Sequence, residues 1–120
     1  MTTEPTTEDS PAPKAGPSMG RATMSAKVKN KKGLHLLPAS TLAHVSSLTG
    51  VRSTVTLDRG DGSEPSVADA TSVSEIVSLG ARHGDTLRVD TFSHDAALSH
   101  AAALVISKLL SSGCGVQEWE

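Results

Sequence analysis

The spacing of the apolar residues changes repeatedly along the chain, and this change constrains the fold more than any other feature. Strand-like alternation occurs at residues 26–29, 51–57, 66–68 and 87–91, and helical spacing occurs at residues 36–49, 72–79 and 98–109. The order β-α-β-β-α-β-α predicts an α+β domain. We expect an open-faced β-sandwich, in which a four-stranded antiparallel sheet is covered on one face by three helices.

Residues at the ends of these segments support the helical interpretation. Gly50 and Gly80 follow the first two helical segments, where a glycine often ends a helix. Pro38 is compatible with the first turn of a helix, because N–H groups there have no partner within the helix. Ser72 and Glu75 have the spacing of a capping box and predict that the second helix begins after Ser72.

The last helix is predicted to begin after a cap formed by Ser93. Its predicted core face consists of Leu98, Ala101, Ala102, Val105, Ile106 and Leu109.

The first 24 residues have a different composition from the rest. They contain four of the six prolines and five threonines, and they lack Val, Ile, Leu, Phe, Trp and Tyr. Such a segment has almost no apolar surface to bury. We therefore expect a disordered Pro/Thr-rich tail over residues 1–24 and a folded domain over residues 25–120.

Composition narrows the class of function. Eleven Lys and Arg against 13 Asp and Glu give a formal net charge of −2, and the chain has one Phe, one Trp and no Tyr, so we expect no nucleic-acid partner. No apolar run is long enough for membrane insertion, which favours a cytoplasmic protein. The single Cys114 and the absence of CxxC or HExxH spacing predict no metal site, and no cofactor is expected.

His35 follows a glycine-containing loop at the predicted start of the first helix. A helix start favours anions, because its N–H groups are unpaired and its dipole is positive there. One nitrogen of an imidazole in this place could carry a phosphoryl group. The residues alone leave open the alternative that His35 is an ordinary helix cap or surface residue.

Residues 30–39, Asn-Lys-Lys-Gly-Leu-His-Leu-Leu-Pro-Ala, resemble the phosphohistidine signature of the HPr family, the phosphocarriers of the bacterial sugar phosphotransferase system. Residues 72–80 resemble the family's regulatory-serine segment, and the resemblance extends from residue 25 to about residue 112. It implies a phosphoryl carrier rather than a turnover enzyme. His35 would accept the phosphoryl group from enzyme I and pass it to an enzyme IIA domain.

One position departs from the family pattern. The family has an arginine two residues after the active histidine, and this chain has Leu37. A leucine cannot pair with phosphoryl oxygens as a guanidinium does, so we expect slower transfer. Arg82 is a candidate substitute, with a solvated loop arginine as the alternative interpretation.

Ser72 resembles the serine that HPr kinase/phosphatase modifies, although the adjacent Thr71 is also open. The alternative function is therefore a regulatory HPr-like protein that is controlled through Ser72 and transfers weakly or not at all through His35. The candidate contacts for phosphate or partners are Leu36, Leu37, Ala39, Ser40, Val73 and Arg82. A monomer is expected.

Overall fold

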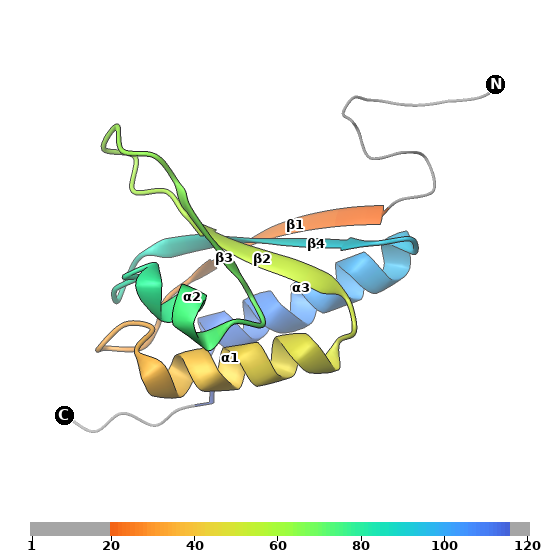
Figure 1. Ribbon diagram of the computed structural model, residues 1–120, viewed down its shortest axis with the longest axis horizontal. Helices are drawn as coiled ribbons and strands as arrows, with labels where there is room; N and C mark the ends of the chain where they lie inside the picture. The colour runs from red at the N-terminus through yellow and green to blue at the C-terminus, as the bar shows by residue number, and fades with distance from the viewer. Residues whose placement is uncertain (1–19, 116–120) are drawn as a thin grey trace.

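The computed structural model describes residues 20–115, which form a four-stranded antiparallel sheet with three helices against one of its faces (Figure 1). The elements are β1 (Gly20–Lys27), α1 (Leu36–Leu48), β2 (Arg52–Leu57), β3 (Ser66–Asp69), α2 (Val73–Ser78), β4 (Thr86–Ser93) and α3 (Ala96–Ser111). The strand order is β1-β4-β2-β3. The predicted α+β open-faced sandwich is confirmed.

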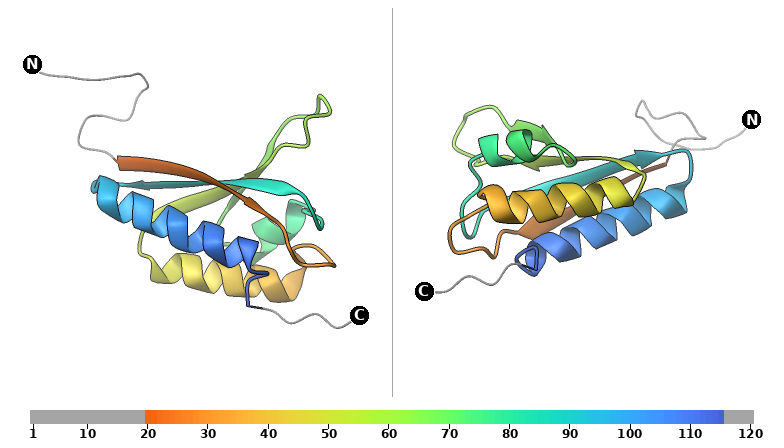
Figure 2. Two further views of the ribbon diagram at one scale, coloured as in Figure 1. Left: turned by 180° about the vertical axis from the view of Figure 1, so that it is seen from behind. Right: turned by 60° about the horizontal axis from the view of Figure 1, so that its bottom comes forward.

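The core lies between the sheet and the helices. In β4, Leu87 and Val89 are fully buried, and they join Leu42 of α1 and Ile106 of α3 in one apolar cluster. Alternate residues of a strand point to opposite faces, so Asp90 and its even-numbered neighbours occupy the face without helices. Figure 2 shows α3 beneath β1 and β4, with α1 running beside it. The opposite face of the sheet is therefore left open.

Strand β1 begins earlier than the sequence predicted. Residues 20–24, which we assigned to the tail, pair with β4 in a register that runs from Gly20↔Ser93 to Lys27↔Thr86. Pairing of this kind uses backbone groups and needs no apolar side chains, so composition could not reveal it. A Cβ on Gly20 would lie 2.4 Å from the Cα of Ala96, and only glycine fits there. The rest of the predicted tail, residues 1–19, lies outside the described residues.

Helix α3 differs from its prediction at its cap and on its buried face. Asp95, not Ser93, is the N-cap, and its carboxylate accepts hydrogen bonds from the N–H groups of Ala97 (2.8 Å) and Leu98 (3.4 Å). Leu98 is 54% exposed, whereas Ser99 is fully buried. The Ser99 hydroxyl donates to the Gly20 carbonyl at 3.0 Å.

The hydrogen bond between Ser99 and Gly20 explains why the buried face of α3 differs from the predicted face. A hydrogen-bonded serine lets α3 approach β1 closely, and the pattern of apolar residues does not indicate such a serine. The buried residues of α3 are Ser99, Ala102, Ala103, Ile106, Ser107 and Leu110. Ala102 and Ile106 are buried as predicted, and Leu109 is partly buried against the core. Ala101 and Val105 are exposed, contrary to the prediction.

Candidate functional site

His35 is the N-cap of α1. Its backbone is extended (φ −79°, ψ −170°), and its carbonyl accepts the Ala39 N–H at 3.0 Å, which closes the first turn. The N–H groups of Leu36 and Leu37 come too early in the helix to have an acceptor within it, and Pro38 has no N–H. Two backbone donors and the positive end of the helix dipole therefore lie next to the imidazole.

The loop that precedes His35 rests on the loop that follows α2. Gly33 has φ +77°, and a Cβ there would lie 2.4 Å from the Ala81 carbonyl oxygen and 3.2 Å from the Arg82 Cα. Leu34 donates its N–H to the same Ala81 carbonyl at 3.1 Å. Only glycine permits this approach, and the approach brings the Arg82 backbone close to the loop two residues before His35.

Arg59 holds this second loop in place. Its guanidinium donates to the Gly80 carbonyl at 2.8 Å and to the Asp85 carboxylate at 3.1 Å. The same carboxylate accepts the Arg82 N–H at 2.8 Å. The Arg59 charge is thus matched by Asp85, whereas the Arg82 side chain is exposed and forms no ion pair with the described residues.

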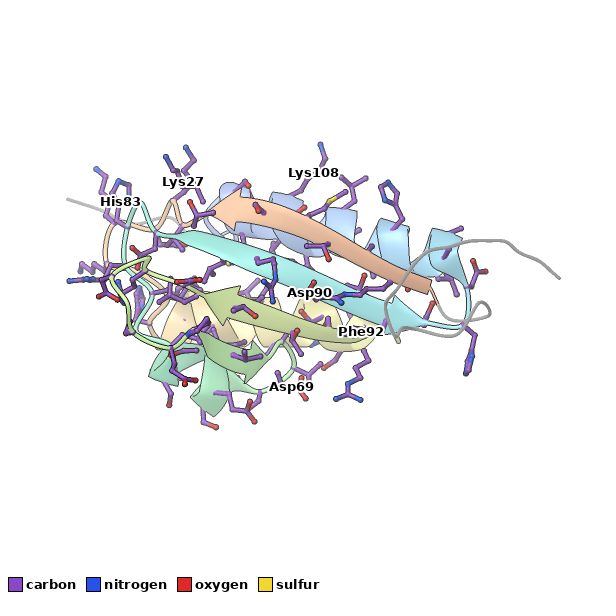
Figure 3. All side chains as sticks on the ribbon, turned by 90° about the horizontal axis from the view of Figure 1, so that it is seen from above. Lys27, Asp69, His83, Asp90, Phe92 and Lys108 are labelled. Carbon is purple, nitrogen blue, oxygen red and sulfur yellow. The ribbon has the colours of Figure 1, made fainter. Side chains whose placement is uncertain are left out.

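Other basic side chains lie at the same end of the molecule as the start of α1 (Figure 3). Lys31 and Lys32 are exposed on the loop before His35. Lys27 and His83 lie at the same end of the molecule (Figure 3). An anion at the start of α1 would therefore experience a positive field from both loops.

Two leucines expose apolar surface beside the imidazole. Leu36 is 66% exposed and Leu37 is 57% exposed. Ala39 is fully buried, so the expectation that it contacts phosphate or a partner is wrong, because the first turn directs this residue into the core. The Ser40 hydroxyl, also predicted as a contact, donates to the Leu36 carbonyl at 2.8 Å.

Ser72 is the N-cap of α2, as predicted. Its hydroxyl accepts the Glu75 N–H at 3.3 Å and lies 3.3 Å from the Ser74 hydroxyl. The predicted capping box is only half formed, because the Glu75 carboxylate accepts the Asp69 N–H at 2.9 Å instead of the Ser72 N–H. The Ser72 N–H, which would donate to the Glu75 carboxylate in a complete capping box, donates instead to the Asp69 carbonyl at 3.0 Å, within the turn before α2.

The turn before α2 is also hydrogen-bonded. The Asp69 carboxylate accepts the Thr71 hydroxyl at 2.7 Å and the Thr71 N–H at 2.8 Å. These hydrogen bonds lower the pKa of Asp69 below its ordinary value. Val73, a predicted partner contact, is half-buried against the core, and Val77 is 39% exposed.

No helix within residues 20–115 has the length and apolar character to cross a bilayer. No group of three His, Cys, Asp or Glu side chains in that range is placed to hold a metal ion.

Comparison with known proteins places the chain in a family. The model of the PTS HPr component phosphorylation site matches residues 22–110. Similar solved structures include HPr-C-His from Thermoanaerobacter tengcongensis (TM-score 0.60, 23% identity, covering 81% of this chain and 99% of that one). Another is the phosphocarrier protein HPr from Bacillus anthracis str. Ames (TM-score 0.61, 20% identity, covering 75% and 96%).

The histidine-containing phosphocarrier protein of Mycoplasma is similar to the same extent (TM-score 0.58, 21% identity, covering 77% of this chain and 96% of that one). Curated protein sequences gave no match. The three structures share the fold described above, and the family model covers β2, β3, β4, α1 and α2 in full and nearly all of β1 and α3. The chain therefore belongs to the HPr family of phosphocarrier proteins of the phosphotransferase system.

Proposed function

We propose that His35 is the residue that carries the phosphoryl group, received from enzyme I and passed to an enzyme IIA domain. The observation that carries this proposal is the start of α1, where an imidazole adjoins two backbone N–H groups without intrahelical acceptors. Such an arrangement stabilises the added negative charge without a metal ion or a cofactor.

The transfer is a pair of displacements at phosphorus. A lone pair of one imidazole nitrogen attacks the phosphorus, and the bond to the donor breaks with its electron pair left on the donor. In the second step, a nucleophile of enzyme IIA attacks the same phosphorus, and the bond to His35 breaks. The N–H groups of Leu36 and Leu37 would donate to the phosphoryl oxygens throughout.

The substitution of leucine for arginine at residue 37 weakens this site without removing it. The backbone donors are independent of side chains, so they survive the change. Lys32 and the exposed Arg82 supply positive charge from the two neighbouring loops. Charges that are exposed and not hydrogen-bonded to the phosphate replace a bidentate guanidinium only in part, so we expect acceptance at a reduced rate.

Leu36 and Leu37 also bear on partner docking. Both are exposed and directly follow His35, so they present apolar surface at the start of α1. Apolar surface surrounded by basic groups is typical of protein–protein contacts. We infer that enzyme I and enzyme IIA dock next to these leucines, close to the imidazole.

The second candidate function is regulatory and rests on Ser72. Its hydroxyl lies at the N-cap of α2, and Val77 nearby is partly exposed. A phosphate there would add about −1.5 to −2 charge next to a surface that partners approach. HPr kinase/phosphatase is the proposed modifying enzyme, and in this case transfer through His35 is weak or absent.

Two parallel incubations separate these functions. In the first, the protein is treated with phosphoenolpyruvate and enzyme I, and in the second with ATP and the kinase. Acid-labile phosphate on His35 in the first reaction supports the carrier. Acid-stable phosphate on Ser72 in the second, together with no labile phosphate in the first, would replace the carrier by the regulatory function.

His44 provides the matched control for the first incubation. It lies on α1, is exposed, and is remote from the helix start. The variant His44→Ala should accept phosphate as fast as the unchanged protein. Equal loss of labeling in His44→Ala and His35→Ala would contradict the assignment to His35.

A further inference from the structure

A second site lies on the open face of the sheet, at the end of the molecule opposite His35. An open pocket of about 560 Å³ is present there. Its lining consists of Gly50, Arg52, Thr54, Phe92, Ser93 and His94. The volume is within the range of sites for small ligands. Figure 3 shows Phe92 far along β4 from Lys27 and His83, which mark the His35 end.

The strand register places an aromatic ring between two arginines. Phe92 is the Cα partner of Arg52 on β2 and of Arg21 on β1. The Arg21 guanidinium lies 5.5 Å from the centre of the Phe92 ring. The only phenylalanine of the chain is thus half-buried, with the Arg21 guanidinium over its ring and Arg52 at the paired position of β2.

The charges of this face are unequally matched. Asp90 accepts hydrogen bonds from Arg21 (3.1 Å), Arg88 (2.8 Å) and Thr23 (2.7 Å). Desolvation acts to raise the pKa of Asp90, but these hydrogen bonds outweigh it and lower the pKa below its ordinary value. The single Asp90 carboxylate therefore forms ion pairs with two arginines, Arg21 and Arg88. Arg52 forms no ion pair or hydrogen bond with any described residue, but its charge adds to the Thr71 hydrogen bonds that lower the pKa of Asp69 on β3. Arg21, Arg88 and Arg52 therefore face two carboxylates, Asp90 and Asp69.

We propose that this pocket binds small organic anions in which a carboxylate or phosphate is joined to an apolar or aromatic body. The Arg52 guanidinium, whose N–H groups donate to no described residue, would bind the anionic group, with the His94 imidazole at the rim as a further hydrogen-bonding group. The Phe92 ring would contact the apolar body. An anion without an apolar part would use only half of the site, as would a neutral ring.

The pocket is separate from the proposed phosphoryl site. Helix α1 connects them, because His35 precedes it and Gly50 follows it. Thirteen residues of helix span about 20 Å at 1.5 Å per residue. A ligand here leaves the His35 end uncovered, so the proposal stands or falls independently of phosphotransfer.

Amide shift titrations of the full chain by NMR test the proposal with four probes. Phenyl phosphate and benzoate combine both features, inorganic phosphate has only the charge, and benzyl alcohol has only the ring. We expect saturable shifts at Gly50, Arg52 and Phe92 for the first two probes, with a dissociation constant of about 1 mM or below. Inorganic phosphate and benzyl alcohol should bind there about tenfold more weakly. The tighter of the two combined probes identifies the preferred anionic group.

Three variants assign the contributions of the side chains. Arg52→Met should weaken both combined probes about tenfold, because a charge-assisted hydrogen bond is lost. Phe92→Leu should weaken them about threefold to tenfold and leave inorganic phosphate unchanged. Lys27→Met is the matched control, since Lys27 is exposed on the same face at the other end of β1. This variant should bind both combined probes within about twofold of the affinity of the unchanged protein.

The proposal would be overturned by an absence of saturable shifts at the pocket up to about 10 mM probe, by unchanged affinity in a folded Arg52→Met, or by equal affinity for inorganic phosphate and phenyl phosphate. Shifts confined to the amides of Leu36 and Leu37 would also overturn it, because they would place the anion at the start of α1 instead.

Discussion

The first N–H groups of α1 and α2 have no acceptor within their helices, and the two helix starts differ in whether a side chain of the chain accepts from them. At α2, the Ser72 hydroxyl accepts the Glu75 N–H, and the Asp69 carboxylate accepts the Thr71 N–H in the turn before it, so the chain itself caps the third N–H group of this helix start. At α1, two N–H groups follow an extended His35, and the third position is Pro38. The comparison indicates that a capped helix start stabilises the fold, whereas an uncapped one is available to an external anion.

The largest expected effect comes from removing the acceptor at the uncapped start. His35→Ala should abolish labeling from phosphoenolpyruvate and enzyme I, because no other residue within 20–115 offers a nucleophilic nitrogen at the start of α1, beside its two backbone donors. Labeling by the kinase at Ser72 should be unchanged. Acid-labile phosphate that persists in His35→Ala would show that the two helix starts do not differ in the way proposed.

Restoring a guanidinium at residue 37 should increase the rate. A charge-assisted hydrogen bond contributes roughly 1.5–3 kcal/mol, which corresponds to about one to two powers of ten if it forms in the transition state. Leu37→Arg should therefore accept phosphate about 10–100 times faster in rapid-quench measurements.

Leu36→Arg is the matched control, because it adds the same charge one residue away on the exposed first turn. It should change the rate less than Leu37→Arg does. If both variants speed transfer equally, the general field matters and the specific contact does not. If neither does, the basic residues of the two loops already supply what the arginine would add.

At the capped start, the main effect should be on stability. Ser72→Ala removes the hydroxyl that accepts the Glu75 N–H, and loss of such a cap costs about 1 kcal/mol. For a domain of this size, that lowers Tm by roughly 4–8 °C. Ser74→Ala is the control, since its hydroxyl contacts only the Ser72 hydroxyl and its loss should leave Tm nearly unchanged. A Tm that is the same in Ser72→Ala and the parent chain would contradict the cap.

The smallest expected effect is the pH dependence of the turn before α2. The folded-state pKa of Asp69 is lowered by the Thr71 hydrogen bonds, so the stabilisation is present above the unfolded-state pKa of about 3.9 and is lost as pH falls through the folded value. Urea denaturation should show Asp69→Asn less stable than the parent at about pH 7 and nearly equal to it at about pH 2. A difference that is constant over this range would argue against an ionised Asp69 in the turn.

The alternation of apolar and polar residues predicted most of the fold, because it depends on which face of each element is buried. The order of elements, the glycines after α1 and α2, and the cap at Ser72 follow from local chemistry and are confirmed. The start of β1 was missed, since backbone pairing leaves no apolar pattern. The face of α3 was displaced because hydrogen-bonded serines occupy positions that the pattern assigns to apolar residues.

The candidate site was predictable only in part. The placement of His35 before a helix follows from Gly33 and Pro38, which are local signals. The closeness of Arg82 to that loop depends on a contact between segments almost fifty residues apart, and the pairing of Arg52 with Phe92 depends on strand register. Tertiary contacts of this kind have no local sequence signature. The sequence therefore showed that Leu37 replaces the family's arginine, but it could not show which residues lie near residue 37 in space.

The amide protons of Leu36 and Leu37 test the difference between the two helix starts most directly. NMR spectra of the protein before and after phosphorylation by enzyme I would report on them, because an N–H that donates to a phosphoryl oxygen shifts strongly downfield. We predict large downfield shifts for these two amides and little change at Glu75, whose N–H is already held by Ser72. Phosphorylated protein in which the Leu36 and Leu37 amides do not move would contradict the account.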